Sequence, residues 1–372
     1  MKIVSLAVIG VILMCVLTCE GADYAGWAVG SSANGYGTIL RTTDSGVTWT
    51  RQGGAQGQIA EAYFSSVYAV NPLTAWVVGN AASGYPTIYN TTDGGSTWLR
   101  QGSAATLPNV SLGKVIVRGS DIWAVGQDAI LHSSDGGTTW ANRLPDGYGN
   151  IILQGLYTLD GKTVWVSGGN KDGYATLLKS EDAGLHWTRE SGGDVSMADH
   201  LLGISAADEK NLWAVGGTGS GYIALHTTDG GTKWTTQAGF TGLYDINEVQ
   251  ALNDSEVWIA ADNAVYRTTD GGENWNSESA GPYTLDVSAV SALQAWAVVS
   301  GSANIGEIWH TSDGGATWDV QGGMPGLSGV SFAVSAVPEP SGGALLAVGT
   351  GVFFWVRRRR STGKSELHSC QR

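Results

Sequence analysis

An eight-residue box that recurs seven times constrains the fold of this chain more than any other feature. Each box follows the pattern S/T-x-D-x-G-x-x-W, as in TTDGGSTW. The box aspartates are Asp44, Asp93, Asp135, Asp182, Asp229, Asp270 and Asp313, and the box tryptophans are Trp49, Trp98, Trp140, Trp187, Trp234, Trp275 and Trp318. Successive box aspartates lie 41 to 49 residues apart, about the length of a four-stranded propeller blade. The chain is therefore built from one repeated unit.

A second tryptophan series runs in step with the boxes. Each box is preceded by a short apolar run that carries one of Trp27, Trp76, Trp123, Trp165, Trp213, Trp258 and Trp296. From the second repeat on, a further strand-like run such as FSSVYAV or INEVQAL stands upstream of the tryptophan run. Together with the runs that flank each box, these segments predict four strands per repeat.

The missing seventh innermost strand is predicted after the last box. The run at 330–336 has no tryptophan strand after it, so we expect it to pair with the strand of Trp27 and close the ring, which removes open sheet edges. The sequence therefore predicts an all-β fold, a single seven-bladed β-propeller of four-stranded blades at 22–336. We expect a signal peptide at 1–21 before it, a sorting signal at 337–360 with a transmembrane helix at 342–356, and a cytoplasmic tail at 361–372.

The repeated pattern resembles the Asp-box, or BNR repeat, of sialidases, sortilin-type receptors, xyloglucan-cleaving hydrolases and propellers that assist photosystem II assembly. The resemblance covers nearly the whole chain between its two ends and implies the same propeller fold. Locally, the Asp carboxylate can accept hydrogen bonds from its own hairpin, Gly adopts positive φ, and Trp holds the turn against the blade. We interpret the boxes as structural. The alternative is that their aspartates form metal or acid–base sites.

Glycoside hydrolysis is the main catalytic alternative. By resemblance, a sialidase-like enzyme needs several arginines at the ring centre, but only Arg118 falls in an expected innermost strand. The hydrolases that act on xyloglucan place their cleft between two such propellers, and this chain has one. His200 is the one histidine of the ring outside the repeat pattern, near Asp194 and Asp199, and we favour a solvated loop there over a catalytic or metal role. We expect no enzyme activity, no catalytic residue, no cofactor and no metal.

A candidate binding face lies on the side opposite the boxes. Four long turns between the second and third strands place tyrosines at matching positions, namely Tyr36, Tyr85, Tyr174 and Tyr222. These side chains could stack on sugars or hold a peptide. The alternative is that each tyrosine begins the third strand and packs between blades. His132, His226 and His310 stand three residues before box aspartates, at positions that we expect to point outward.

Charge narrows the partners. Residues 22–336 contain 13 lysines and arginines against 30 acidic residues, which leaves a net charge of −17 and disfavours nucleic acid. The resemblance to photosystem II assembly propellers implies a generic assembly or binding role. The basic patch expected in that family has no evident source in this sequence.

The two ends of the chain predict export and sorting. Met1 and Lys2 precede an apolar run typical of a secretory signal, which signal peptidase would cut between Cys19 and Asp23. A lipoprotein modified at Cys19 is the alternative. Near the other end, Pro338-Glu339-Pro340, an apolar run at 342–356 and the cluster Arg357, Arg358, Arg359, Arg360 resemble the PEP-CTERM signal that exosortase processes in Gram-negative bacteria. A plain membrane anchor would need no Pro-Glu-Pro motif.

These observations favour an exported, non-catalytic binding or scaffold propeller. The resemblance to the sorting signal implies that exosortase processes it after transient anchoring in the inner membrane through the C-terminal helix. The propeller would then lie outside the cytoplasm, at the cell surface or in the extracellular matrix, with a glycan or a protein as ligand. A purely structural component of the extracellular polysaccharide matrix is a further alternative.

Overall fold

A computed structural model describes residues 23–33, 36–52, 59, 63–103, 105–240, 246–262, 264–278, 283–300, 305–333, 346–348 and 352–354. The chain divides into two compact units, Met1–Ser335 and Ala336–Arg372. The expected signal peptide, the Pro338-Glu339-Pro340 motif and the cluster from Arg357 to Arg360 lie outside the described residues.

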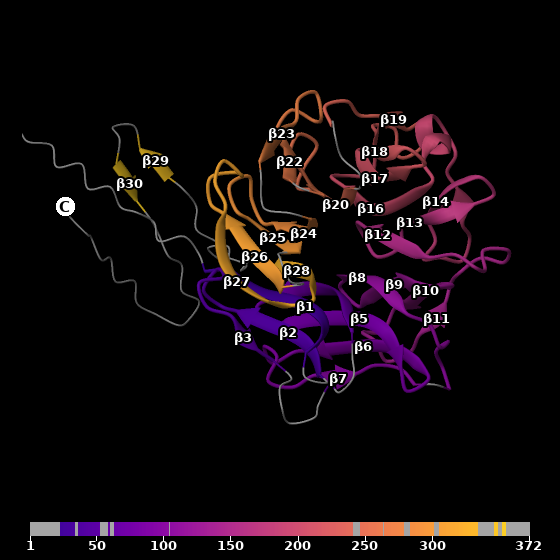
Figure 1. Ribbon diagram of the computed structural model, residues 1–372, viewed down its shortest axis with the longest axis horizontal. Coiled ribbons are helices and arrows are strands. Elements are labelled where there is room, and N and C mark those ends of the chain that lie inside the picture. The colour runs from indigo at the N-terminus through magenta and orange to yellow at the C-terminus, as the bar shows by residue number, and fades with distance from the viewer. Residues whose placement is uncertain are drawn as a thin grey trace, which may run out of the picture. The chain divides into compact units, whose positions relative to one another are not determined.

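In the first unit, the described residues form seven four-stranded antiparallel sheets, which are the blades of a propeller (Figure 1). Blade 1 consists, from the axis outward, of β28 (Leu327–Ala333), β1 (Ala25–Ala33), β2 (Tyr36–Thr42) and β3 (Thr50–Arg51). Blade 2 has β4 (Phe64–Asn71), β5 (Thr74–Ala82), β6 (Tyr85–Thr91) and β7 (Leu99–Arg100). Blade 3 has β8 (Leu112–Arg118), β9 (Asp121–Gly126), β10 (Ala129–Ser133) and β11 (Ala141–Asn142).

The remaining blades repeat this order. Blade 4 has β12 (Leu153–Thr158), β13 (Val164–Lys171), β14 (Tyr174–Ser180) and β15 (Thr188–Arg189). Blade 5 has β16 (His200–Ala206), β17 (Leu212–Thr218), β18 (Gly221–Thr227) and β19 (Thr235–Thr236), with a short 3-10 helix η1 (Asp194–Met197) before it. Blade 6 has β20 (Ile246–Ala251), β21 (Val257–Ala261), β22 (Ala264–Thr268) and β23 (Asn276–Glu278). Blade 7 has β24 (Thr284–Ala289), β25 (Ala295–Ser300), β26 (Ile305–Thr311) and β27 (Asp319–Pro325).

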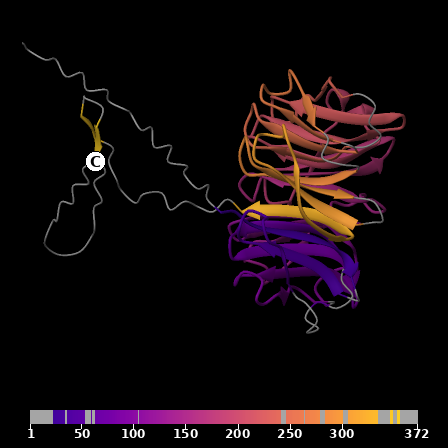
Figure 2. The same cartoon turned by 60° about the vertical axis from the view of Figure 1, so that its left-hand side comes forward.

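The ring closes as the sequence predicts, with one blade made from both ends of the propeller. Strand β28 pairs with β1, so that the yellow and indigo ends of the propeller lie side by side (Figure 2). In this pairing Trp27 lies opposite Ser331. The closing strand begins at Leu327 rather than at 330, because only Gly326, at φ 73°, separates it from β27. In Figure 1 the innermost strands β8, β12, β16, β20, β24 and β28 lie around the middle of the ring.

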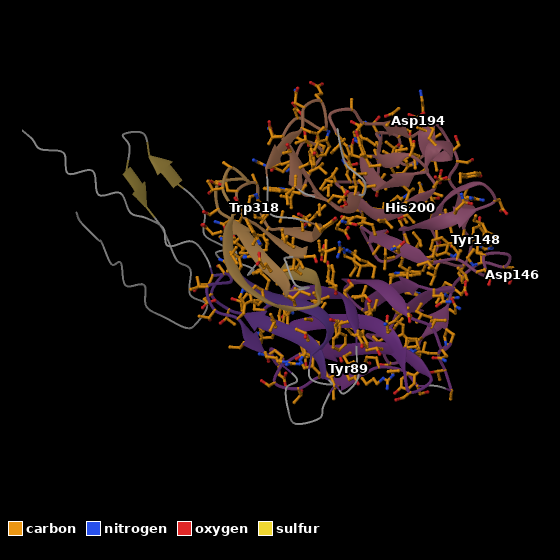
Figure 3. All side chains as sticks on the ribbon, viewed as in Figure 1. Tyr89, Asp146, Tyr148, Asp194, His200 and Trp318 are labelled. Atoms are coloured by element: carbon orange, nitrogen blue, oxygen red, sulfur yellow. The ribbon has the colours of Figure 1, made fainter. Side chains whose placement is uncertain are left out.

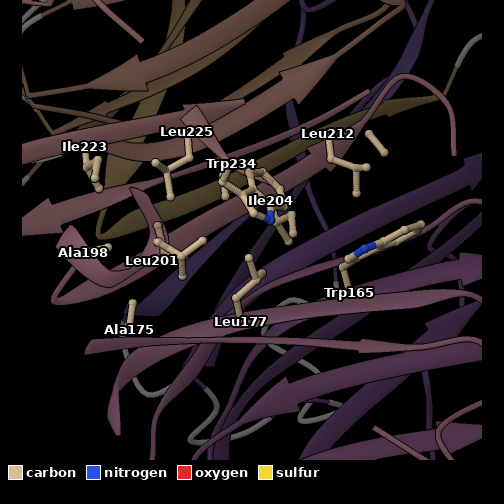
Figure 4. Close-up of a cluster of buried hydrophobic side chains, with 13 residues drawn as sticks. Trp165, Ala175, Leu177, Ala198, Leu201, Ile204, Leu212, Ile223, Leu225 and Trp234 are labelled. Carbon is tan, nitrogen blue, oxygen red and sulfur yellow. The ribbon is translucent and has the colours of Figure 1, made fainter. Parts of the chain in front are cut away.

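Tryptophans pack the blades against one another. At four of the junctions between described blades, the box tryptophan of one blade lies edge-on to the tryptophan on the second strand of the preceding blade. The ring centroids of Trp275 and Trp213, for example, are 5.6 Å apart at 83°. Trp165 and Trp234 share a buried cluster with Leu177, Leu201 and other side chains of blades 4 and 5 (Figure 4). Such aromatic pairs bury large apolar areas and stabilise the ring without disulfides.

At the closure, Phe332 of β28 joins this packing. Its ring stacks on Trp296 of blade 7, with centroids 3.6 Å apart, and lies edge-on to Trp49 of blade 1 at 5.8 Å. The blade made from both chain ends is therefore held to blade 7 by a stacked aromatic pair, in place of the edge-on tryptophan pairs found between other blades.

Side chains of one innermost strand satisfy backbone N–H groups of the next. Ser205 Oγ accepts a hydrogen bond from Ala251 N at 3.0 Å, and Ser331 Oγ accepts one from Ala69 N at 3.0 Å. These bonds occupy donors on the sheet edge that faces the axis. They link neighbouring blades around the channel.

In the second unit, the described residues form two short antiparallel strands, β29 (Leu346–Val348) and β30 (Val352–Phe354). These six residues fall inside the segment for which the sequence predicts a helix, 342–356, and they adopt strand conformation instead. The other residues of that segment lie outside the described residues. Among the described residues, no helix has the length and apolar character needed to cross a membrane.

Candidate binding site at the propeller axis

The seven boxes share one hydrogen-bond pattern. In the second box, Asp93 Oδ1 accepts from Thr97 N at 2.9 Å and from Thr91 Oγ1 at 2.9 Å, and Asp93 Oδ2 accepts from Thr97 Oγ1 at 2.7 Å. The corresponding backbone bond to Asp44, Asp135, Asp182, Asp229, Asp270 and Asp313 spans 2.8 to 2.9 Å. These bonds hold the hairpin of each box, so the carboxylates are occupied within their own turns.

Hydrogen bonds also set the acidity of the boxes. Bonds from the side chain and backbone of Thr97 lower the pKa of Asp93 to about 2, and bonds from Thr139 lower the pKa of Asp135 to about 2. A carboxylate that stays ionised in this way accepts hydrogen bonds but does not donate a proton near neutral pH. Among the described residues, no group of three His, Cys, Asp or Glu side chains could hold a metal ion.

The histidines before the boxes do not point outward, and that expectation was wrong. His132 is buried and stacks on Trp123 with ring centroids 3.9 Å apart, and His226 stacks on Trp213 at 3.8 Å. His310 stacks on Trp296 in the same way. Adjacent strands place these side chains directly opposite each other, so the histidine covers the tryptophan of its own blade.

The tyrosines of the expected binding face are partly buried within their own blades. Arg100 lies 3.6 Å above the ring of Tyr85, and Arg189 lies 4.0 Å above that of Tyr174. Tyr222 lies edge-on to Phe240. The structure does not describe the side chain of Tyr36. The three described rings pack against three different hydrophobic clusters of the propeller. This arrangement favours the interpretation that the tyrosines pack in the propeller over a shared binding face.

A bulge near the start of every innermost strand builds a cavity on the axis. The pairing register with the second strand shifts by one residue at this point in all seven blades. A bulge redirects the extra residue away from the regular alternation of the strand. The bulge residues are Ser65, Gly113, Gln154, Leu202, Asn247, Leu285 and Ser328, and all seven line a cavity of about 430 Å³.

The residues that follow the bulges form the floor of this cavity. They include Lys114 of β8, Glu248 of β20 and Asp286 of β24, whereas Gly155, Gly203 and Gly329 occupy the same place in other blades. Lys114 Nζ forms an ion pair with Glu248 Oε2, which joins blades 3 and 6 across the axis. The three charged residues also line a second cavity of about 190 Å³. The ion pair therefore separates two halves of the channel.

Asp286 has an unusual environment among the charged groups of the floor. Its carboxylate accepts hydrogen bonds from Val330 N and Val287 N, both at 2.9 Å. Burial raises the pKa of Asp286 to about 6, and Glu248 adds to the rise, while Lys114 opposes it. Burial lowers the pKa of Lys114, but Glu248 and Asp286 outweigh that effect and the net shift is upward. Asp286 therefore changes its protonation in a range close to neutral pH.

The mouth of the larger cavity lies where the innermost strands begin, on the face opposite the boxes. Tyr63, Ile152 and Tyr283 stand just before the first residues of β4, β12 and β24, and their exposed fractions are 50%, 58% and 62%. Ile152 lines the cavity, and the other two occupy the same repeat position. We call these three residues the rim. Exposed apolar side chains around a concave site are typical of binding surfaces.

His200 begins β16 and holds the rim position of blade 5, near the middle of the ring, whereas Asp194 lies farther out (Figure 3). Asp194 Oδ2 accepts a hydrogen bond from Thr236 N at 2.8 Å. The two residues therefore lie in different parts of blade 5, and His200 stands at the start of a strand rather than in the solvated loop that we favoured.

Arg118, the arginine expected near the axis, lines the smaller cavity on the box side of the channel. It donates a hydrogen bond to Tyr68 Oη, and its guanidinium lies 5.5 Å from the ring of Tyr68 and 5.9 Å from that of Tyr157. No other arginine lines either of the two described cavities. An arginine cluster of the sialidase type is thus absent from the described part of the channel.

Sequence reasoning missed the rim and the charged floor. The signal for the floor was available, because Lys114, Glu248 and Asp286 interrupt apolar runs that were assigned to innermost strands. An ionisable residue in such a run faces the axis or a neighbouring blade. The rim has no comparable signal, since its residues lie in the links between blades.

The sequence and the fold are similar to those of several known proteins. A family model described as photosynthesis system II assembly factor YCF48 matches residues 71–147, from the end of β4 to the loop after β11. The structure of YCF48 from Cyanidioschyzon merolae is 20% identical, covers 70% of this chain and 85% of that chain, and has a TM-score of 0.52. A structure of YCF48 bound to D1 peptide is also 20% identical, with 70% and 82% coverage and a TM-score of 0.53.

The fold is also similar to that of glycoside hydrolases. The GH74 xyloglucanase from Xanthomonas campestris is 14% identical, covers 84% of this chain and 55% of that chain, and has a TM-score of 0.55. No curated protein matches the sequence. At these identities the likeness to solved structures establishes the propeller fold, which hosts many unrelated functions.

Proposed function

We propose that this protein is a non-catalytic binding or scaffold module whose axial cavity holds part of a protein or glycan ligand. One observation carries the proposal. At each of the seven bulges, one residue per blade points into a single shared cavity. These seven residues differ from blade to blade, whereas the seven boxes are nearly identical in sequence. Variation at equivalent positions of a regular repeat is where a solenoid or propeller acquires specificity.

The comparisons support a protein ligand within this proposal. A propeller of the same fold is described as bound to a peptide, and a family model of that group matches part of this chain. The generic assembly or binding role inferred from the resemblance is consistent with both observations. The acidic charge of residues 22–336 continues to argue against a nucleic-acid partner.

The proposal includes export and sorting. The N-terminal apolar run and the Pro-Glu-Pro motif support removal by signal peptidase, transient anchoring in the inner membrane and processing by exosortase. Replacement of Pro338-Glu339-Pro340 by alanines should leave an unprocessed membrane form, detected by membrane fractionation and mass spectrometry of the mature ends. Unchanged processing would contradict the exosortase assignment.

Glycoside hydrolysis is the second candidate, favoured by two carboxyl residues on the axis, one of them Asp286 with its raised pKa. A pair of carboxyl groups is what most glycosidases require. The hydrogen bonds argue against it, because backbone N–H groups donate to both oxygens of Asp286 and Lys114 pairs with Glu248. A general acid needs a proton on an oxygen that can reach the leaving group.

The test is a screen of peptide and glycan arrays with the full-length chain, in which bound ligand and released sugar are measured on the same samples. The double substitution Tyr63→Ala with Tyr283→Ala should abolish binding without a loss of thermal stability. Leu185→Ala, a substitution of an exposed residue in the fourth box on the opposite face, serves as the matched control and should bind normally. Release of sugar that Glu248→Gln abolishes would favour the hydrolase instead.

A further inference from the structure

The floor of the axial cavity carries more negative than positive charge. Glu248 and Asp286 supply two carboxyl groups against the single ammonium of Lys114. The net charge of −17 over residues 22–336 gives the surrounding field the same sign. An acidic ligand is therefore repelled from the floor, and a cationic one is attracted to it.

Both carboxyl groups keep capacity to accept further hydrogen bonds. An ionised carboxylate has about four lone-pair positions. Asp286 accepts from two backbone N–H groups, and Glu248 accepts from Lys114 and from its neighbour Val249 at 3.2 Å. Both side chains line the cavity, so their remaining acceptor positions are available to a group that enters it. A guanidinium or ammonium group brings donors only and fits these acceptors.

The wall next to the two carboxylates carries two leucines, one on each side of Asn247 of blade 6. Leu202 and Leu285 are the bulge residues of blades 5 and 7, which flank the blade of Glu248. Lysine and arginine side chains have an apolar stem below a charged head, and the stem can pack along such a wall. If such a side chain enters the cavity, its sequence neighbours in the ligand can pack on the exposed rim residues Tyr63, Ile152 and Tyr283.

We propose that the axial cavity receives an arginine or lysine side chain of a partner protein, with its head group at Glu248 and Asp286 and its stem between Leu202 and Leu285. The inference rests on the proposed binding function and names the partner's chemistry at that site. A neutral sugar lacks the positive charge, and no sugar ring has the linear apolar stem that this arrangement accommodates.

The floor also gives this interaction a pH dependence. The carboxyl group of Asp286 faces Lys114 from β8, Glu248 from β20 and the N–H of Val330 from β28. Its pKa of about 6 means that it takes up a proton as the pH falls through that value, and the attraction for a cation is then lost. His200 on β16 also stands at the mouth, so the Asp286→Asn variant is needed to assign a pH dependence to Asp286.

The experiment compares two peptides that differ only in charge. The peptide acetyl-Leu-Arg-Leu-amide and its citrulline counterpart, in which a neutral urea replaces the guanidinium, are titrated into the full-length chain by NMR at several pH values. The arginine peptide should bind about tenfold more tightly at neutral pH, the order expected for a charge-assisted hydrogen bond. The difference should shrink as the pH falls below about 6. Glu248→Gln and Asp286→Asn should each remove most of it.

Two controls keep the result interpretable. Glu181→Gln removes an exposed carboxylate paired with Lys179 in the fourth box, and it should leave both affinities unchanged. Asp286 also accepts hydrogen bonds from two backbone N–H groups, so thermal melting must show that the Asp286→Asn variant folds. Glu248→Gln leaves both of those bonds intact. Equal affinities for the two peptides, or no binding of either, would overturn the inference. The proposed binding function would still stand if ligands found in the array screen lost affinity for the variant Tyr63→Ala with Tyr283→Ala. A pH dependence that survives in Asp286→Asn would contradict the role of that residue.

Discussion

The box face and the axial mouth of this propeller are built by opposite rules. On the box face, seven turns repeat one arrangement of Asp, Thr or Ser, and Gly, and each carboxylate is occupied within its own hairpin. At the mouth, seven equivalent bulges present residues that range from glycine to leucine and glutamine. The comparison teaches that regularity in this chain marks the scaffold, and that function is to be sought where equivalent positions differ.

A substitution in the strand that closes the ring should destabilise the propeller most. Phe332→Ala removes the ring that lies against both Trp296 and Trp49, and should lower the free energy of unfolding by about 4 kcal/mol, as expected for deletion of a buried aromatic side chain. Chemical denaturation measures the change. Phe332→Leu keeps most of the buried volume and should lose clearly less. Equal losses would mean that the aromatic contact does not hold the closing strand.

Substitutions of the two glycines in the third box distinguish the cost of backbone strain from the cost of a steric clash between blades. Gly136 and Gly137 both have positive φ, but a Cβ on Gly137 would lie 2.6 Å from the Trp76 ring of the preceding blade, whereas nothing lies within 4 Å of one on Gly136. Gly137→Ala should therefore lower the free energy of unfolding by about 3 kcal/mol, and Gly136→Ala by about 1 kcal/mol. Denaturant titration of both variants tests this, and similar losses would refute the interblade contact.

Acid should weaken the box face before it affects the apolar core. Hydrogen bonds lower the pKa of Asp93, Asp135, Asp182 and Asp313 from 3.8 to about 2. Their contribution to stability is present above pH 3.8 and is lost as the pH falls towards 2, because the unfolded chain binds protons first. Melting temperatures across this range measure it. A flat profile below pH 3.8 would contradict the structural role of the boxes.

The stacked histidines should also lower the stability of the protein, at a higher pH than the boxes do. This loss must be subtracted before the effect of the boxes is measured. Burial lowers the pKa of His132, His226 and His310 below 6.5. The unfolded chain therefore gains protons first as the pH falls through 6.5, and stability begins to decline there. The step below pH 3.8 is then attributed to the boxes.

The smallest expected effect belongs to a single box. Asp135→Asn keeps the shape of the side chain but removes the charge that accepts bonds from Thr139 N and Thr139 Oγ1. The melting temperature should fall modestly, and any ligand affinity should stay unchanged, because the box lies on the face opposite the rim. A large loss of affinity at unchanged stability would assign these aspartates a functional role instead.

The sequence predicted the seven blades and the closing pair because boxes and tryptophans recur in register. The three charged residues of the floor stand out in the sequence, but their convergence on one cavity could not be predicted, for two physical reasons. The bulge before Lys114, Glu248 and Asp286 is a one-residue shift in pairing, which composition does not reveal. Moreover, these residues come from blades 3, 6 and 7, and only closure of the ring brings them together.

The tyrosines show how recurrence can suggest a site, although packing between blades was the other interpretation of the same pattern. Tyr85 and Tyr174 recur at matching positions, which suggested a shared surface, but Arg100 and Arg189 cover their rings within separate blades. In a propeller, residues at equivalent positions are spread around the ring. Recurrence therefore indicates equivalent packing more often than convergence on one ligand.

One experiment separates scaffold from binding surface: affinity and melting temperature are measured together for Asp135→Asn and for the double variant Tyr63→Ala with Tyr283→Ala, against a ligand from the array screen. We predict a crossed result, in which the box variant melts at a lower temperature and binds normally, and the rim variant melts normally and loses binding. Loss of binding in the box variant with an unaffected rim variant would contradict the assignment of the boxes to the scaffold and of the rim to binding.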